Sequence, residues 1–320
     1  MLKHRHAIVF SLTKELLMLS IVLKTRRIRH CIGLMLLFGL TCMAQAQNSS
    51  ASAAPSDQQA LVGKVVFLEL VTPDLMAAQR FYGGLLGWTF SEMSSGTVKY
   101  VEARADGQPV AALMQKELAA GAKRQPAWLN FIAVSDVDAA KAAALHRGAK
   151  LLLDSHTIPH RGRAAIFADP QGAVFAILAS SSIDPADVLA APGEWIWSSL
   201  LTRDPDAAAA FYQDVFGYEV FDLGKQGDID HLMLSSGNFA RASVNTLPSS
   251  WSKAHAHWLS YVRVENVAAA AQRAVALGGQ VLVAPHMDRH GGMLAVVSDP
   301  QGAPFGLLEW SEANSKEQTK

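Results

Sequence analysis

Hydrophobic and polar positions run through the same succession of patterns four times from about residue 62 onward. A strand-like apolar stretch leads to an Asp or Asn, an Ala-rich run with an apolar stripe at helical spacing follows, and a glycine ends the run. The strand-like stretches are residues 65–71, 129–134, 196–201 and 259–264. Asp or Asn caps the free N–H groups of a first helical turn, and glycine suits the left-handed conformation after a last turn. The pattern therefore predicts four strand–helix units.

Short strand-like segments separated by turns follow each predicted helix. In the first unit they are residues 89–92, 98–103 and 109–114, and in the second 151–153, 163–167 and 173–178. The sequence Asp169-Pro170-Gln171-Gly172 has the residues that a type I turn favours at its first, second and fourth positions. Each unit thus predicts the order strand, helix and three strands.

The four units form two longer repeats related by a shift of 130 residues. Asp74–Gly87 falls on Asp204–Gly217, Gly107 on Gly237, Trp128 on Trp258, and Asp169–Ala173 on Asp299–Ala303, a register that predicts no insertion between the copies. A fainter repeat offset by 62 residues lies inside each copy. A fixed period over more than 100 residues indicates a duplicated unit. We expect one domain at residues 62–180, a linker at 181–191 and a second domain at 192–311.

The first 60 residues belong to neither copy. Residues 24–30 are basic, 31–43 are apolar and 44–46 read Ala-Gln-Ala, which is typical of a secretory signal peptide. We expect a signal peptide at residues 1–46 cleaved after Ala46, a flexible lead-in at 47–61 and a polar tail at 312–320. The expected location is secreted or periplasmic. The alternatives are an uncleaved N-terminal membrane anchor and a start at Met18 rather than Met1.

Removal of the leader changes the charge of the chain. Residues 1–46 hold 7 of the 28 lysines and arginines and 1 of the 28 aspartates and glutamates, so the remainder carries a formal charge of −6. A mildly acidic chain does not favour nucleic acid as a partner, and we expect no stable membrane insertion after cleavage. Both cysteines, Cys31 and Cys42, lie in the leader, so the mature chain has no disulfide framework.

These motifs carry a family resemblance. A strand, Asp, a helix with Phe-Tyr, Gly-Trp or Gly-Tyr, and Asp-Pro-Gln-Gly-Ala before a last apolar strand resemble the vicinal oxygen chelate superfamily, also called glyoxalase/bleomycin-resistance/dioxygenase-like. The resemblance implies an α+β fold of two tandem glyoxalase-like domains, each built from two βαβββ modules curving around a cleft. Isomerases, dioxygenases and binding proteins share this fold, so the fold does not identify a reaction.

The resemblance also implies where a metal would bind, on the first and last strands of each module. The positions counted from the helix-entry residue and from the turn glycine are Phe67, Leu129, Trp197, Leu259, Ala111, Ala176, Arg241 and Gly306. None of these residues is an ordinary ligand of a divalent metal. We therefore expect no metal cofactor. A strand register shifted by one residue pair would bring in Glu69 and keep a divalent metal as the alternative.

Histidines near the end of the chain provide a second possible metal site. His286, Asp288 and His290 alternate, but Pro285 and the following glycines favour a loop. His255 and His257 precede a predicted strand, where a surface position is the more common explanation. We expect these histidines to be solvated.

A cleft without a metal would be a mostly apolar pocket with a few polar contacts, as small-molecule sites commonly are. The predicted ligand-binding residues are Phe67, Tyr100, Phe131, Glu102 and Arg163 in the first domain and Trp197, Tyr261, His231, Ser199, Arg241 and His290 in the second, with Glu69 as a candidate catalytic base. For Arg241 two interpretations stay open, a clamp for a carboxylate or phosphate and an arginine reaching to the rim. The helix aromatics Phe81, Tyr82, Phe211 and Tyr212 are expected to fill the core.

Two functions are consistent with these residues. The first is an exported protein that binds a small organic molecule in a cleft without a metal. The alternative is a lyase or isomerase of the glyoxalase type that acts on a carbonyl compound, with Glu69 as base or with a divalent metal. Because four modules lie in one chain, a monomer is self-sufficient, and a homodimer is the other expected state.

Overall fold

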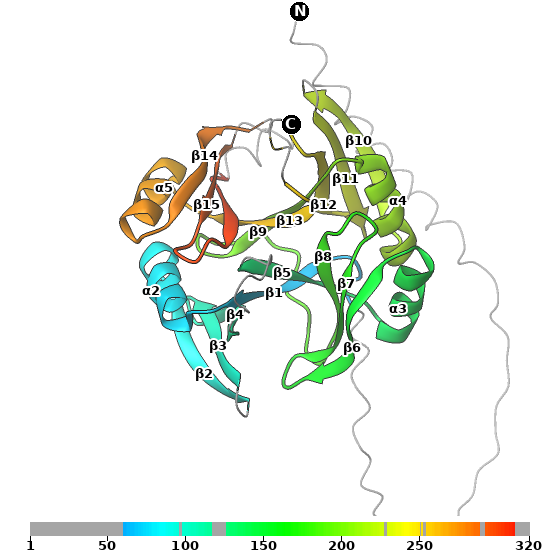
Figure 1. Ribbon diagram of the computed structural model, residues 1–320, viewed down its shortest axis with the longest axis horizontal. Coiled ribbons are helices and arrows are strands. Elements are labelled where there is room, and N and C mark those ends of the chain that lie inside the picture. The colour runs from blue at the N-terminus through cyan, green and yellow to red at the C-terminus, as the bar shows by residue number, and fades with distance from the viewer. Residues whose placement is uncertain are drawn as a thin grey trace, which may run out of the picture. The chain divides into compact units, whose positions relative to one another are not determined.

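The computed structural model describes residues 60–95, 98–116, 126–226, 229–249, 251, 254–288 and 292–310. The predicted signal peptide, most of the predicted lead-in, His290 and the predicted tail lie outside the described residues. Within the described ranges, four helices and sixteen strands repeat the order βαβββ four times. Figure 1 shows how these elements are arranged. The predicted α+β fold with two tandem domains is confirmed. None of these helices is long and apolar enough to cross a membrane.

The first domain is one eight-stranded sheet with two helices. Its elements are β1 (Val65–Thr72), α2 (Leu75–Leu86), β2 (Thr89–Ser95), β3 (Val98–Ala105), β4 (Gln108–Gln115), β5 (Ala127–Ala133), α3 (Val137–His146), β6 (Lys150–Ile158), β7 (Gly162–Ala168) and β8 (Val174–Ser180). The strand order is β2-β3-β4-β1-β5-β8-β7-β6, with β1 antiparallel to β5 where the two modules meet. The residues at the middle of the sheet therefore come from both modules.

The second domain repeats this arrangement. Its elements are β9 (Trp195–Thr202), α4 (Pro205–Phe216), β10 (Glu219–Gln226), β11 (Ile229–Ser236), β12 (Phe239–Thr246), β13 (His257–Arg263), α5 (Val267–Ala276), β14 (Gln280–Met287), β15 (Met293–Ser298) and β16 (Pro304–Leu308). The strand order is β10-β11-β12-β9-β13-β16-β15-β14.

The helix ends follow the predicted chemistry. The Asp74 side chain accepts a hydrogen bond from the backbone N–H of Ala77, and Asp204 does the same for Ala207. Gly87 and Gly217 end α2 and α4 with φ of 74° and 70°, a left-handed conformation that glycine adopts without strain. The boundaries of the helices are thus set locally by the sequence.

The helices of the two domains share their cores. One buried cluster, the first shared core, combines residues of the second module, such as Phe167 and Phe175, with residues of the third, such as Phe211 and Tyr212. The second shared core combines the first and fourth modules. In agreement, α3 lies against α4 and α2 against α5 (Figure 1). Each shared core is therefore made half by one domain and half by the other.

A series of three hydrogen-bonded side chains crosses each shared core. The Trp128 indole N–H donates to the Tyr82 hydroxyl at 3.0 Å, and this hydroxyl donates to the Asp299 carboxylate at 3.3 Å. The other core repeats this arrangement with Trp258, Tyr212 and Asp169, at 2.9 and 3.2 Å. The helix tyrosines are buried, as core filling requires, and they also join the two domains.

The predicted insertion-free register between the copies is wrong in one region. Glu92 faces Val101 in the first domain, whereas Asp222 faces Leu232 in the second, so the offset rises from 130 to 131 between β10 and β11. The pairing shifts between Asp222 and Lys225, where Gly224 has φ of 79°. A bulge of this kind adds one residue to one strand. The offset between equivalent residues of the two copies stays at 131 through β12 and returns to 130 at β13.

The expected loop around His286 is also wrong. Strand β14 continues to Met287, and His286 pairs with Leu294 of β15. Because β14 is at the edge of its sheet, the missing N–H of Pro285 is tolerated. His286 is exposed there, as expected for a solvated side chain.

Candidate functional site

The face of the first sheet opposite its helices gathers a set of polar and aromatic residues. Leu68 and Leu70 of β1 belong to the core under the helices. Side chains alternate along a strand, so Phe67 and Glu69 point to the other face, which we call the helix-free face. Phe67 lies 5.3 Å from Phe131 of β5 between ring centroids, in a small apolar cluster that contains no helix residue.

Four polar side chains meet on this face and form what we call the Glu69 cluster. They are Glu69 of β1, Tyr100 and Glu102 of β3, and Arg161 of the β6–β7 turn. The Tyr100 hydroxyl donates to Glu69 Oε2 at 3.2 Å, and Arg161 Nη2 donates to Glu102 Oε2 at 3.1 Å. The Arg161 guanidinium also lies over the Phe67 ring, 3.8 Å from its centroid. Two modules thus contribute to one polar site.

Burial dominates the electrostatics of Glu69. Loss of hydration raises the pKa of its carboxyl from 4.5 to about 7, while the Tyr100 hydrogen bond and the charge of Arg161 act in the opposite direction. Burial and the neighbouring Glu69 raise the pKa of Tyr100 above its ordinary range. Near neutral pH, Glu69 can therefore both hold and release a proton, while Tyr100 stays a neutral donor.

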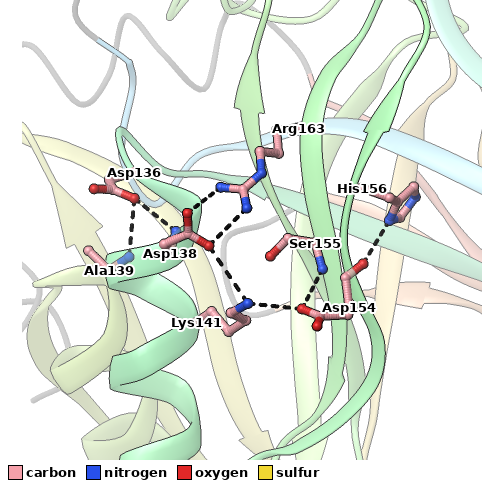
Figure 2. A network of polar contacts seen from close by, with 8 residues as sticks. All are labelled: Asp136, Asp138, Ala139, Lys141, Asp154, Ser155, His156 and Arg163. Atoms are coloured by element: carbon pink, nitrogen blue, oxygen red, sulfur yellow. Dashed lines mark hydrogen bonds and ion pairs between the residues drawn. The ribbon is translucent and has the colours of Figure 1, made fainter.

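The structure brings together five of the residues predicted for the first domain, namely Phe67, Glu69, Tyr100, Glu102 and Phe131. It does not bring Arg163 to them. Arg163 is exposed on the helix-covered face, where both terminal nitrogens bind the carboxylate of Asp138 at the start of α3, at 2.5 and 2.9 Å (Figure 2). The adjacent Ala164 occupies the helix-free face instead. Arg163 therefore lies apart from the other residues predicted for the first domain.

Arg161 takes the place predicted for Arg163. The sequence comparison missed Arg161 because its counterpart in the second copy is Gly291, so no arginine repeats. The signal available in the sequence is Gly162 directly after Arg161 and before a predicted strand, and in the structure His160 and Gly162 have φ of 60° and 134°. From this turn the Arg161 side chain reaches Phe67 and Glu102 of the first module.

The helix-free face of the second sheet has Ser199 at the position of Glu69. The Trp197 indole N–H donates to Ser243 Oγ at 3.1 Å, and the Ser199 and Ser243 hydroxyls are hydrogen-bonded at 2.8 Å. Tyr261 lies against Gly306, where an added Cβ would come within 1.9 Å of its ring. His231 is hydrogen-bonded to Asn245. Ser243 and Asn245 were not among the predicted residues, because the added residue in β10 moves them onto this face.

Arg241 is held at the linker rather than beside Ser199 and Ser243. It sits on a bulge of β12, and its structural counterpart is Val110 rather than Ala111. Its side chain is buried and forms an ion pair with Asp187 at 2.5 Å, and Asp187 also binds Lys64 at 2.9 Å. Arg241 thus ties the second domain to the linker and, through Asp187 and Lys64, to the start of the first.

The donor set of the helix-free faces does not fit the superfamily's metal. Because of the bulges in the two hairpins, the strand positions that face Glu69 and Ser199 are Ala112 and Ser243. Phe67, Ala176 and Gly306 offer no side-chain donor. Within the described ranges, no three His, Cys, Asp or Glu side chains lie together as a metal would require.

A hollow of about 630 Å³ lies elsewhere, between the start of β1 and the linker. Its lining includes Asp184 and Asp187. Asp184 accepts hydrogen bonds from the Leu61 backbone N–H and from Ser180, and Asp187 binds Lys64 and Arg241. These carboxylates already hold the linker in place, so the Glu69 cluster remains the stronger candidate site.

Comparison with known proteins identifies the class. Residues 64–177 match the Glyoxalase/Bleomycin resistance protein/Dioxygenase superfamily, and residues 197–308 match a glyoxalase-like domain. The chain belongs to this superfamily. It is 31% identical over 245 residues to a Mycobacterium tuberculosis protein named "Putative glyoxylase CFP32", covering 76% of this chain and 93% of the relative. It is also 31% identical to the anthracycline biosynthesis protein DauV of Streptomyces sp., covering 78% of this chain and 94% of the relative.

Solved structures share the fold at low sequence identity. The Mn(II)-bound glyoxalase from Novosphingobium aromaticivorans is 17% identical with a TM-score of 0.54, covering 78% of this chain and 83% of that one. The 2,3-dioxygenase LapB from Pseudomonas sp. is 14% identical with a TM-score of 0.56, covering 78% and 93%. At these identities the likeness concerns the fold, and the chemistry has to be argued from the residues of this chain.

Proposed function

We propose that this protein binds a small organic molecule on the helix-free face of its first sheet, at the Glu69 cluster. The observation that carries the proposal is the meeting of Glu69, Tyr100 and Arg161 beside the aromatic pair Phe67 and Phe131. Few polar groups in an apolar surround are the usual composition of a small-molecule site. The second sheet has no charged counterpart of Glu69, which supports the first domain as the binding domain.

We further propose that binding needs no metal on the strands. The strand positions where the superfamily resemblance implies ligands hold Phe67, Ala176 and Gly306, which have no donor atoms in their side chains. The metal content of purified protein, measured by mass spectrometry before and after chelation, tests this. A stoichiometric divalent metal whose removal abolishes ligand binding would contradict a metal-free site.

A ligand screen by thermal shift tests the binding function. Compounds that raise the unfolding temperature should do so less in Tyr100→Phe, which loses the hydroxyl beside Glu69. The matched control is Ser199→Ala, which stands at the position of Glu69 in the other domain. If no carbonyl, aromatic or acidic compound stabilises the protein, or if only the control variant loses the effect, the first domain is not the binding domain.

One observation favours catalysis as a second candidate. A general base works best when its pKa lies near the working pH, and burial brings the pKa of Glu69 to about 7. Glu69 would then remove a proton next to a carbonyl group, as in an isomerase or lyase. Incubation of α-protonated carbonyl compounds with the protein in D₂O would reveal exchange of that proton by NMR. Exchange that persists after chelation and is lost in Glu69→Gln supports this role.

We also propose that the chain is exported. The support is the basic, apolar and Ala-Gln-Ala succession within residues 24–46. N-terminal sequencing of the protein recovered from its native host tests the proposal. A first residue of Gln47 is expected, and a retained leader would favour the membrane anchor.

A further inference from the structure

The Arg161 guanidinium is held in place from two sides. Its backbone lies in a tight turn whose next residue, Gly162, has φ of 134°, and an added Cβ at Gly162 would meet the Ala179 carbonyl oxygen at 2.1 Å. Its side chain crosses from the second module to Phe67 and Glu102 of the first. A cation placed by both backbone and side-chain contacts loses little conformational freedom when it binds a ligand.

The guanidinium keeps donors for a further acceptor. Arginine carries five N–H donors in a planar fork; Glu102 accepts from one terminal nitrogen, Nη2, and the Tyr100 hydroxyl is a second hydrogen-bond partner of the guanidinium, which leaves further donors. Carboxylates match this fork by accepting two parallel hydrogen bonds. Arg161 is therefore suited to a planar acidic group.

The charges around Arg161 do not cancel when Glu69 is protonated. Glu102 binds two cations, Arg161 at 3.1 Å and Arg104 at 2.5 Å. With a proton on Glu69, two guanidinium groups face one carboxylate. The four residues of the cluster are then neutral overall, and Arg104, which lies outside the cluster and is more exposed, adds one positive charge beside it that attracts a single negative charge.

Half-buried apolar residues flank the cluster on the same face. Leu129, Ile158 and Ile166 pack against the apolar cluster of Phe67 and Phe131 while remaining partly exposed. An apolar molecule that covers them gains the free energy of removing their surface from water.

From these contacts we propose that the ligand of the first domain is a monocarboxylic acid with an apolar or aromatic body, whose carboxylate binds Arg161. The proposal rests on the proposed binding function and specifies the chemical class of the ligand. One excess positive charge matches a carboxylate better than a phosphate ester with two negative charges. Arg161 acts in place of the sequence-predicted Arg163 and Arg241, whose charges are paired with Asp138 and Asp187.

The test uses fluorinated probes observed by ¹⁹F NMR at pH 6.5 with the full mature chain. The probes are 4-fluorobenzoate, 4-fluorophenylacetate, their neutral amides and 4-fluorophenyl phosphate. The carboxylates should bind at least tenfold more tightly than the amides. Arg161→Met should remove this preference, whereas Arg163→Met, two residues away and on the other face, should keep it.

A second variant tests the proposal independently if Arg161→Met does not fold. Glu102→Gln removes the carboxylate that competes for Arg161, so it should bind the carboxylate probes several-fold more tightly than the wild type. The proposal is overturned if the amides bind as well as the acids, if the phosphate ester binds best, or if Glu102→Gln weakens carboxylate binding. Binding of amides alone would overturn the acid preference and leave the binding function standing, whereas binding of no probe would count against both.

Discussion

The Tyr82 hydroxyl donates a hydrogen bond to Asp299 at 3.3 Å, although one residue belongs to the first domain and the other to the second. Tyr212 and Asp169 repeat the contact in the opposite direction between the domains, at 3.2 Å. This pairing gives a physical reason for the motifs that both copies retain. The Phe-Tyr pair on one helix and the Asp-Pro-Gln-Gly turn of the other domain are the two halves of one interface.

Tyr82→Phe should destabilise the protein by about 1–3 kcal/mol, because Asp299 loses a buried donor and the Trp128 indole loses its acceptor. Urea unfolding measures the change. Tyr212→Phe is the matched variant and should cost a similar amount. Since the two hydrogen-bonded series lie in separate cores, the double variant should show nearly additive losses. An unchanged midpoint in both single variants would contradict a stabilising role.

Asp187→Asn should cost about 3–5 kcal/mol, because it leaves the buried Arg241 guanidinium without a carboxylate. Asp138→Asn is the control, since it breaks the exposed ion pair with Arg163 and should cost far less, because solvent screens exposed ion pairs. The free energy of unfolding in urea at pH 7 distinguishes them. Equal losses in the two variants would show that Arg241 is not held by Asp187.

Glu69→Gln should stabilise the protein at alkaline pH. The folded-state pKa of Glu69, about 7, lies above the ordinary value of 4.5, so the wild type loses stability as the pH rises from about 4.5 through 7. Glutamine mimics the protonated form and avoids this loss, which amounts to roughly 3 kcal/mol by pH 8. Unfolding curves at several pH values should show the two proteins converging below pH 4.5. The exposed Glu219→Gln serves as the control and should show no such trend.

Carboxylate binding should weaken above neutral pH. The charged or titratable groups around Glu69 are Tyr100, Glu102, Arg104 and Arg161, and Tyr100 stays neutral because its pKa is raised. Ionisation of Glu69 cancels the excess positive charge, so affinity for 4-fluorobenzoate should fall by up to about tenfold per pH unit above pH 7. Glu69→Gln should keep its affinity between pH 6 and 9. If the affinity of the wild type for 4-fluorobenzoate does not change with pH, the ionisation of Glu69 does not affect carboxylate binding.

Local patterns in the sequence were sufficient for the modules and the helix ends, because capping residues and glycines act within a few positions. Asp74, Asp204, Gly87 and Gly217 all perform the roles predicted for them. The strand aromatics Phe67 and Phe131 also meet, because period-two alternation fixes the face of a strand residue once the strand is placed.

The site was harder to predict because it depends on register. The single residue added within β10 exchanges the two faces of the strands that follow it, so Ser243 rather than Ala242 lies beside Ser199. A comparison at a constant offset therefore assigned Arg241 to the wrong position. The partner of each helix could not be read from the sequence either, since it depends on which modules pack across the domains.

The two shared cores determine what happens if the chain is cut between residues 180 and 192. Each half would keep a complete sheet and lose the apolar surface that covers its helices, with Tyr82 and Asp299 left on different molecules. The halves should therefore fail to fold separately and should recover native structure only when mixed. In its packing the protein thus resembles a dimer of two similar domains, and the linker between them makes the two domains one molecule.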